Sequence, residues 1–332
     1  MCNARHRGFP VLVPSLLYLS FLVSGLPGYV HAQEAPGVGN TTRGIDLYQQ
    51  GDAAGAIKIL KEVVKKHPED ADAWYYLGLA FNSQGMIGQA RPQFEHLIQL
   101  RPESADAHAK LAYALIVADQ PQKAMTMAQR AIELGDQSPE DRYALAEASF
   151  RMASAEKAVE EADAALIMNP DFLPALITKS LAHFTLKQYT EAAGSLEKFL
   201  AKSPDNFDAD TWREQLKVMQ EQAAAPSTTT QPAVETTTFN AKTVTQKARV
   251  LSKPEPQYTE AARLAGVEGT IVIRGIFSSD GEVRHLIVTR ALGYGLTTAA
   301  IRSAHQIEFQ PAMKDDRPVS MYIQLEYQFH LF

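Results

Sequence analysis

The sequence is almost free of cysteine, since Cys2 is the single cysteine in 332 residues. One thiol cannot form a disulfide within the chain, and it cannot supply a thiolate metal site. If the N-terminal segment is removed, as the next features predict, no cysteine nucleophile remains either. A thiol-free mature chain suits an oxidising compartment.

Sequence motifs of common catalytic sites are also missing. There is no glycine-rich phosphate loop, no Gly-x-Ser-x-Gly turn and no paired-histidine motif, and the nine histidines show no ligand-like spacing. We therefore expect no enzyme activity, no metal and no cofactor. The formal net charge of −6, without a basic patch, also argues against nucleic acid as a partner.

The first 32 residues are typical of a secretory signal peptide. Arg5 and Arg7 form a basic head, Leu16–Val23 is an apolar core, and Val30-His31-Ala32 is a small-x-small cleavage site. The alternative is a membrane anchor, because no formal charge occurs from residue 8 to residue 33. Prolines within this stretch interrupt it as a helix and favour cleavage.

An internal repeat follows. Alanine recurs every 34 residues, at Ala56, Ala90, Ala124, Ala158 and Ala192. Around Ala90, a first predicted helix carries Trp74, Leu77, Gly78 and Phe81, and a second carries Phe94 and Leu97. Small residues at fixed spacing allow two helices to approach closely, and the aromatic residues fill the space between repeats.

These residues resemble the tetratricopeptide repeat (TPR) family. The resemblance implies an all-α solenoid of five repeats plus a capping helix over residues 37–223, with the capping helix at about Asp210–Ala223. It also implies a concave groove, lined by the first helix of each repeat, that binds a protein segment. The 34-residue register places seven side chains near that groove: Tyr75, Leu79, Tyr113, Ile116, Tyr143, Leu181 and Phe184. Packing between repeats is the alternative role for each of them.

Residues 224–239 are rich in threonine, alanine and proline and show no periodicity. Such a composition predicts a linker. We therefore expect the parts on either side to engage different partners without rigid coupling.

Residues 240–332 carry an α+β pattern. Thr270–Ser278 and Val283–Thr289 flank Asp280-Gly281, which predicts a tight hairpin with positive φ at both turn residues. Leu296–Gln306 is a predicted helix, and apolar and polar residues alternate over Val319–Phe329, as in a half-buried strand.

This segment resembles the TonB C-terminal domain. The matching residues are Pro254, Pro256, Tyr258, Ala261, Ala262, Arg263, Gly266, Glu268, Gly269, Asp280, Gly281, Leu296, Ala299, Ala300, Phe309, Pro311, Ala312, Pro318 and Val319. Thr297 departs from the family pattern and is a candidate helix N-cap. The resemblance implies a small domain with a three-stranded antiparallel sheet that docks on a partner by strand addition.

The last predicted strand is the expected docking edge. Its candidate contact residues are Val319, Ser320, Tyr322, Gln324, Glu326 and Gln328. An edge strand offers unpaired backbone groups that an extended peptide can satisfy.

Three functions follow as hypotheses. The first is an adaptor in the periplasm of a Gram-negative bacterium, whose partners are proteins or peptides such as outer-membrane receptors. The second is a TonB-type energy transducer anchored in the inner membrane, which requires that the leader stays uncleaved. The third is a structural protein of the cell envelope.

Overall fold

The computed structural model describes residues 38–135, 138–206, 208–224 and 238–331. The predicted signal peptide, and the predicted linker from residue 225 to residue 237, lie outside these ranges. In the described ranges, no helix has both the length and the apolar character needed to cross a membrane.

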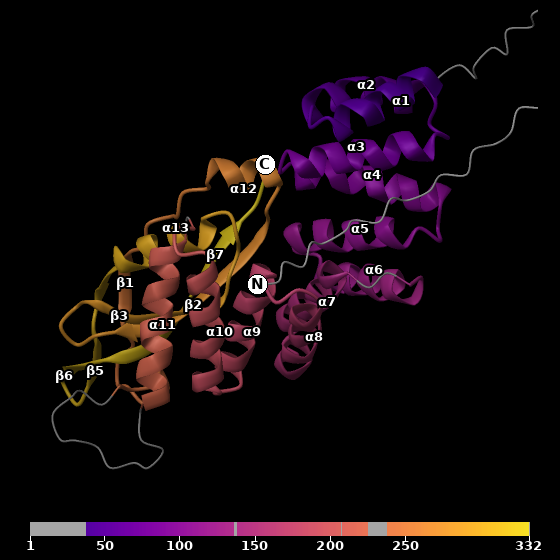
Figure 1. Ribbon diagram of the computed structural model, residues 1–332. Coiled ribbons are helices and arrows are strands. Elements are labelled where there is room, and N and C mark those ends of the chain that lie inside the picture. The colour runs from indigo at the N-terminus through magenta and orange to yellow at the C-terminus, as the bar shows by residue number, and fades with distance from the viewer. Residues whose placement is uncertain (1–37, 136–137, 207, 225–237, 332) are drawn as a thin grey trace, which may run out of the picture. The chain divides into compact units, whose positions relative to one another are not determined.

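Ten helices form five consecutive antiparallel pairs, and an eleventh helix follows them (Figure 1). The helices are α1 (Val38–Gln49), α2 (Ala53–Lys66), α3 (Ala71–Ser83), α4 (Ile87–Leu100), α5 (Ala105–Val117), α6 (Pro121–Glu133), α7 (Pro139–Arg151), α8 (Ala155–Met168), α9 (Leu173–Thr185), α10 (Tyr189–Lys202) and α11 (Ala209–Ala224). Each helix packs on the next one along the chain, as expected for a solenoid.

The repeat in the sequence sets the helix boundaries and the helix packing. Asp70, Ser104 and Ser138 lie 34 residues apart, and each side chain accepts a hydrogen bond from the backbone N–H three residues later, which caps α3, α5 and α7. The five alanines at the same interval are at most 1% exposed, because they lie where paired helices meet.

The turn between the two helices of each pair contains a residue with positive φ, again every 34 residues. These residues are Gly51, Gly85, Asp119, Ala153 and Lys187. Glycine adopts this conformation freely, whereas a residue with a Cβ is strained by roughly 1 kcal/mol. The last three turns therefore retain side chains in a conformation that favours glycine.

The C-terminal part contains seven strands and two helices. They are β1 (Arg249–Ser252), α12 (Glu260–Ala265), β2 (Gly269–Phe277), β3 (Val283–Arg290), α13 (Leu296–His305), β4 (Glu308–Gln310), β5 (Ala312–Lys314), β6 (Arg317–Val319) and β7 (Met321–Phe329). The main sheet is antiparallel with the order β3-β2-β7, and β1–β4 and β5–β6 form two further antiparallel pairs. The predicted three-stranded sheet is thus confirmed.

Strand β7 has one buried and one exposed face. Leu325, Tyr327 and Phe329 are buried and pack in one apolar core with residues of α12 and α13, while the even-numbered residues from Tyr322 to Gln328 are exposed. The alternation of apolar and polar residues in the sequence therefore predicted the buried and exposed faces of β7 correctly.

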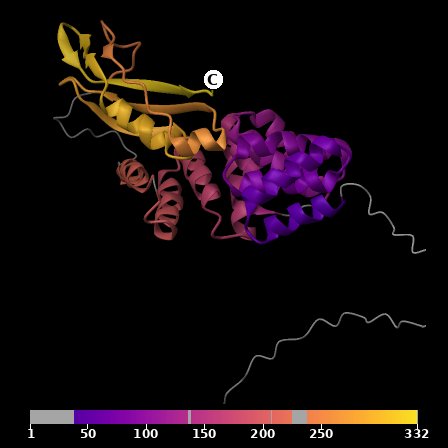
Figure 2. The same ribbon diagram turned by 90° about the horizontal axis from the view of Figure 1, so that it is seen from above.

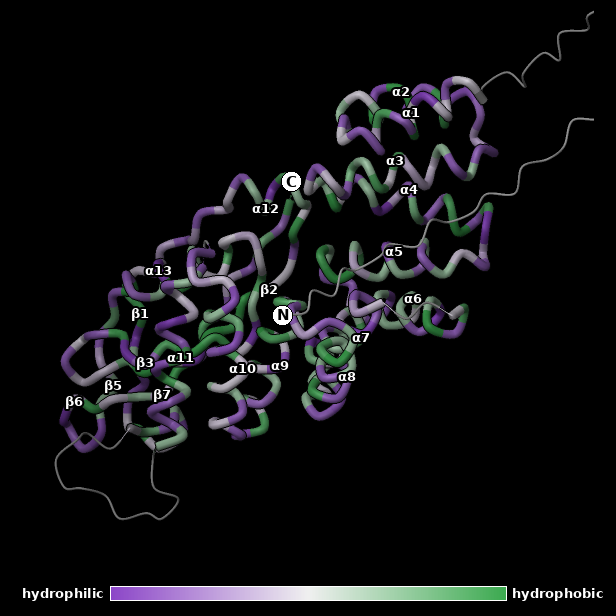
Figure 3. Tube along the Cα trace, in the orientation of Figure 1, coloured by the Kyte–Doolittle hydropathy of each residue, from purple (hydrophilic) through white to green (hydrophobic). Residues whose placement is uncertain are grey.

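The views in Figures 1 and 2 both place the C-terminal elements beside α9, α10 and α11, and α9 and α11 contact β3. Along the repeat helices, hydrophilic and hydrophobic segments alternate (Figure 3).

The β2–β3 turn differs from the predicted tight hairpin. Gly281 has φ +91°, but Asp280 is not among the residues with positive φ. Gly281 N–H donates to Ser278 O at 3.1 Å, and Ser278 N–H donates to Glu282 O at 2.9 Å. The connection is therefore a three-residue loop that ends in a left-handed glycine, which needs positive φ at one residue rather than two.

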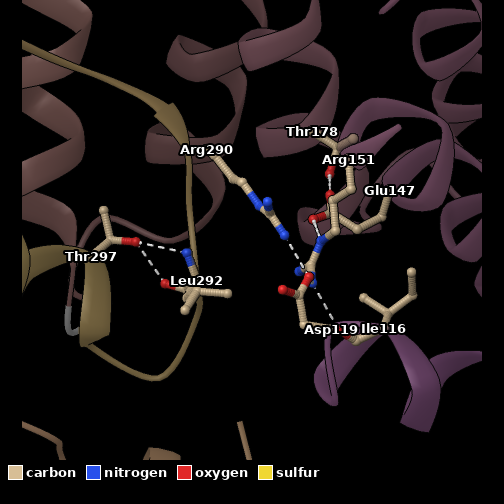
Figure 4. A network of polar contacts seen from close by, with 8 residues as sticks. All are labelled: Ile116, Asp119, Glu147, Arg151, Thr178, Arg290, Leu292 and Thr297. Carbon is tan, nitrogen blue, oxygen red and sulfur yellow. Dashed lines mark hydrogen bonds and ion pairs between the residues drawn. The ribbon is translucent and has the colours of Figure 1, made fainter. Parts of the chain in front are cut away.

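Two further predictions require correction. Val319 belongs to β6, where it pairs with Ala312, and the buried Ser320 separates β6 from β7. Thr297 is not an N-cap, since Gly295 occupies that position. The Thr297 hydroxyl instead donates to Leu292 O at 2.6 Å and accepts from Leu292 N–H at 3.1 Å (Figure 4).

Candidate functional site

A glutamine of the capping helix closes one edge of the main sheet. Gln215 on α11 is fully buried, and its Nε2 donates to Leu286 O at 3.2 Å while its Oε1 accepts from Val288 N–H at 2.7 Å. Leu286 and Val288 lie two residues apart on β3, so these backbone groups point away from β2. One side-chain amide thus occupies the place of a neighbouring strand.

Ion pairs connect the end of β3 to the repeat helices (Figure 4). Asp119 accepts from Arg290 at 2.5 Å and from Arg151 at 3.0 Å, and Arg151 also donates to Glu147 at 2.8 Å. Thr178 completes the network by donating to Glu147 at 2.7 Å. Burial lowers the pKa of Arg151, but the charge of Glu147 and its hydrogen bond outweigh that effect and raise it, so the guanidinium stays charged.

Backbone and apolar contacts join the same two parts. Glu268 N–H donates to Val117 O at 3.0 Å, and Ile87 and Val117 share an apolar core with β2 and β7. Gly266 has φ +71°, and a Cβ there would lie 3.0 Å from the Cα of Gly88. Glycine is therefore required both by the backbone conformation and by the close approach.

These contacts correct the expectation that the repeats and the C-terminal domain are uncoupled. Residues Gly37–Phe332 form one unit, in which hydrogen bonds, ion pairs and a shared core join the two parts. A linker composition permits independent motion but does not prevent two surfaces from binding each other.

Four of the seven predicted groove residues come together at this junction. Tyr113, Ile116, Tyr143 and Leu181 line a cavity of about 310 Å³, and residues of the C-terminal domain, Val267, Leu292 and Tyr294, line it as well. Phe184 lines two neighbouring cavities. Tyr75 and Leu79 lie elsewhere, packed against the apolar core of the N-terminal repeats.

The cavity walls are predominantly apolar and carry neutral phenols. Burial, with a smaller contribution from Tyr294, raises the pKa of Tyr113 well above its usual range. Burial and the nearby charge of Glu147 also raise the pKa of Tyr143. Asp208 lines the same cavity, and burial raises its pKa although hydrogen bonds from Thr298 and the backbone oppose the shift.

The opposite edge of the sheet, on β7, is largely open. Phe239 forms a bridge with the start of β7, where its N–H donates to Ser320 O and its carbonyl accepts from Tyr322 N–H. Because backbone groups of even-numbered residues point away from β2, Gln324, Glu326 and Gln328 also present theirs to this edge. The Nζ of a lysine, Lys253, binds Glu326 O, and within the described chain no strand pairs with this side of β7.

The structure thus separates the predicted edge residues into two groups. Tyr322, Gln324, Glu326 and Gln328 lie on β7 with exposed side chains, whereas Val319 and Ser320 precede it. Ser320 is 3% exposed, and its Oγ accepts from Ser279 N–H.

Sequence reasoning missed the residues that hold the junction. Asp119 carried a usable signal, because it stands in the 34-residue register where Gly51 and Gly85 occupy the earlier turns. Arg290 and Gln215 carried none, since a single arginine at the end of a strand and a single glutamine within a helix are both ordinary. Among the described residues, no group of three or more His, Cys, Asp or Glu side chains could hold a metal ion.

Family models match both parts of the chain. Models described as tetratricopeptide repeat match residues 41–86 and 81–149, and the model described as Gram-negative bacterial TonB protein C-terminal matches residues 254–331. A model described as anaphase-promoting complex, cyclosome, subunit 3, matches residues 117–199. The fold and these matches define a repeat solenoid joined to a small α+β domain. The chain is a tetratricopeptide repeat protein with a TonB C-terminal domain.

Solved structures match the solenoid. The chain is similar to the MamA protein at 27% identity, with a TM-score of 0.43 over 52% of this chain and 94% of that one. It is similar to the type IV pilus biogenesis factor PilW at 14% identity, with a TM-score of 0.48 over 57% of this chain and 88% of that one. The TPR protein YrrB matches at 19% identity, with a TM-score of 0.45 over 54% and 92%. No curated protein matches the sequence.

Proposed function

We propose that this protein is an exported periplasmic adaptor, whose TonB-like domain binds an extended segment of an envelope protein by strand addition to β7. The observation that carries the proposal is the difference between the sheet edges: Gln215 closes β3, while the backbone groups of Gln324, Glu326 and Gln328 line an edge without a neighbouring strand in the described chain. An extended peptide satisfies such groups through main-chain hydrogen bonds.

The repeats have a structural role in this proposal. Four of the residues that a TPR groove would offer to a partner lie at the junction with the TonB-like domain. They are Tyr113, Ile116, Tyr143 and Leu181. In this arrangement the solenoid holds the domain so that β3 is covered and β7 faces outward. Tyr75 and Leu79 lie outside that junction, on repeats that remain candidates for a second protein segment.

A proline at position 326 tests strand addition. The Glu326 N–H points away from β2, so Glu326→Pro removes one donor from the open edge without removing a β2–β7 hydrogen bond. Glu326→Thr is the matched control, because it removes the carboxylate but keeps the N–H. A photo-crosslinking amino acid at position 328, in a Gram-negative host, reports contact with an envelope protein. We expect one crosslinked product with Glu326→Thr and its loss with Glu326→Pro; an equal yield from both variants would contradict strand addition.

Fractionation and N-terminal sequencing test the location. A periplasmic product that begins near Gln33 supports the adaptor, since the predicted cleavage site follows Ala32. An intact inner-membrane product that begins at Met1 contradicts export as a cleaved protein, and it favours the anchored energy transducer.

A further inference from the structure

A basic cavity lies beside the open edge of β7. It has a volume of about 300 Å³, and twelve residues from the repeats and the sheet line it. Four of the twelve are basic and none is acidic: Arg151, Lys187, Arg274 and Arg290. This local charge contrasts with the formal net charge of −6 for the whole chain.

Within the residues that the structure describes, two of the four cations have no acidic partner. Arg151 and Arg290 are paired with Asp119 and Glu147, as described above. Arg274 and Lys187 are exposed, and neither forms an ion pair within the described part of the chain. The cavity therefore presents two uncompensated positive charges to a ligand.

Arg274 and Lys187 both lie close to the open β7 edge of the sheet. Arg274 on β2 is the register partner of Gln324 on β7, and both line the cavity. Lys187 has φ +62° in the turn between α9 and α10, where the first two repeats have Gly51 and Gly85. A lysine in that conformation is strained relative to glycine, so the side chain is retained in the cavity at a cost to stability.

Phe184 and Tyr189 extend the site with apolar surface. Their rings lie 5.3 Å apart, and both line this cavity and the adjoining one that reaches Tyr322 and Ile323. A strand added beside Gln324 would direct alternate side chains toward this face of the sheet. Residues of the repeats and residues of the sheet would then contact the same side chains of the added strand.

We propose that the cavity is a carboxylate subsite, in which Arg274 and Lys187 bind an Asp or Glu side chain of the extended segment while Phe184 and Tyr189 contact an apolar neighbour. The inference rests on the proposed function, because the segment must first add to β7. It assigns to the TPR array a part in selecting the segment that the TonB-like domain binds.

Random ten-residue peptides displayed on phage, selected against the purified full chain, provide the probe. We expect the enriched peptides to share an acidic residue at a fixed position within an alternating apolar pattern. The enriched peptides are then synthesised with Glu or Gln at that position, and their affinities are measured by fluorescence anisotropy. With the wild-type chain, the peptide that carries Gln should bind about fivefold more weakly than the peptide that carries Glu. This difference should be smaller at high salt.

The double variant Arg274→Gln with Lys187→Gly should reduce that difference to less than about twofold, as expected when the charged partners are removed. Lys187→Gly introduces the residue found at the equivalent turns of the first two repeats, so the variant is expected to fold. An unchanged preference for Glu, or enriched peptides without a fixed acidic position, would overturn the subsite. Absence of enrichment, or binding that survives Glu326→Pro, would overturn strand addition itself.

Discussion

The two outer strands of the main sheet, β3 and β7, have opposite surroundings. The repeat helix α9, the capping helix α11 with its buried Gln215, and an ion-pair network cover β3. Strand β7 is contacted on its outer side by Phe239 at one end and by the amino group of Lys253 near the other. The sheet therefore depends on the solenoid at one edge and is free for a partner at the other, and the effects of substitutions should differ accordingly.

The largest expected effect concerns the closed edge. Gln215→Ala leaves Leu286 O and Val288 N–H buried without their partner, and each such group costs about 1 to 3 kcal/mol. We expect the free energy of unfolding to fall by about 3 kcal/mol in urea denaturation. Gln220→Ala, at an exposed position of the same helix, is the control and should change it by less than about 0.5 kcal/mol. If Gln215→Ala and Gln220→Ala lowered the free energy of unfolding equally, α11 would not close the β3 edge of the sheet.

A smaller loss is expected where the end of β3 is anchored. Asp119→Ala removes the carboxylate shared by Arg290 and Arg151, whose side chain is 6% exposed, and should cost about 2 kcal/mol. Asp119→Asn is the matched variant, because asparagine tolerates the positive φ and loses only the charge. Thermal unfolding of both should rank Ala below Asn and Asn below wild type. A wild-type Tm for Asp119→Ala would show that the network does not hold β3.

The comparison of edges also shows what the sequence could predict. The 34-residue spacing gave the helix pairs and their alanine contacts, because those depend on local packing. The alternation after Val319 gave the faces of β7. The cover over β3 could not be predicted, because Gln215 and Leu286 are 71 residues apart and nothing local marks their contact. The proximity of Tyr113 and Tyr143 to Tyr294 could not be predicted either, because it depends on how the repeats pack against the C-terminal domain.

On the inner face of β7, a conservative change should increase stability. Tyr327 is 1% exposed, and its hydroxyl has no hydrogen-bond partner within the described residues. Tyr327→Phe should therefore raise the free energy of unfolding by about 1 kcal/mol at neutral pH. Tyr322→Phe, on the exposed face of the same strand, is the control.

The same substitution should alter the alkaline pH dependence. Burial, with a smaller contribution from Glu255, raises the pKa of Tyr327 from 10.0 to about 12. Between these values the folded chain keeps a proton that the unfolded chain releases, so stability falls as the pH rises through this window. Tyr327→Phe removes that contribution, and urea denaturation at pH 9 to about pH 11 should show a shallower decline. A decline identical to that of the wild type would contradict the assignment.

The smallest effect is expected at the open edge. Gln324 carries the same amide as Gln215, but its Nε2 binds the exposed Glu326 carboxylate rather than the backbone of a strand. Gln324→Ala should therefore change the free energy of unfolding by less than about 0.5 kcal/mol in the same urea assay. A loss comparable with that of Gln215→Ala would show that β7 is not free, because the removed amide must then have satisfied buried groups. Near-wild-type stability would leave Gln324 available for a residue of the added strand.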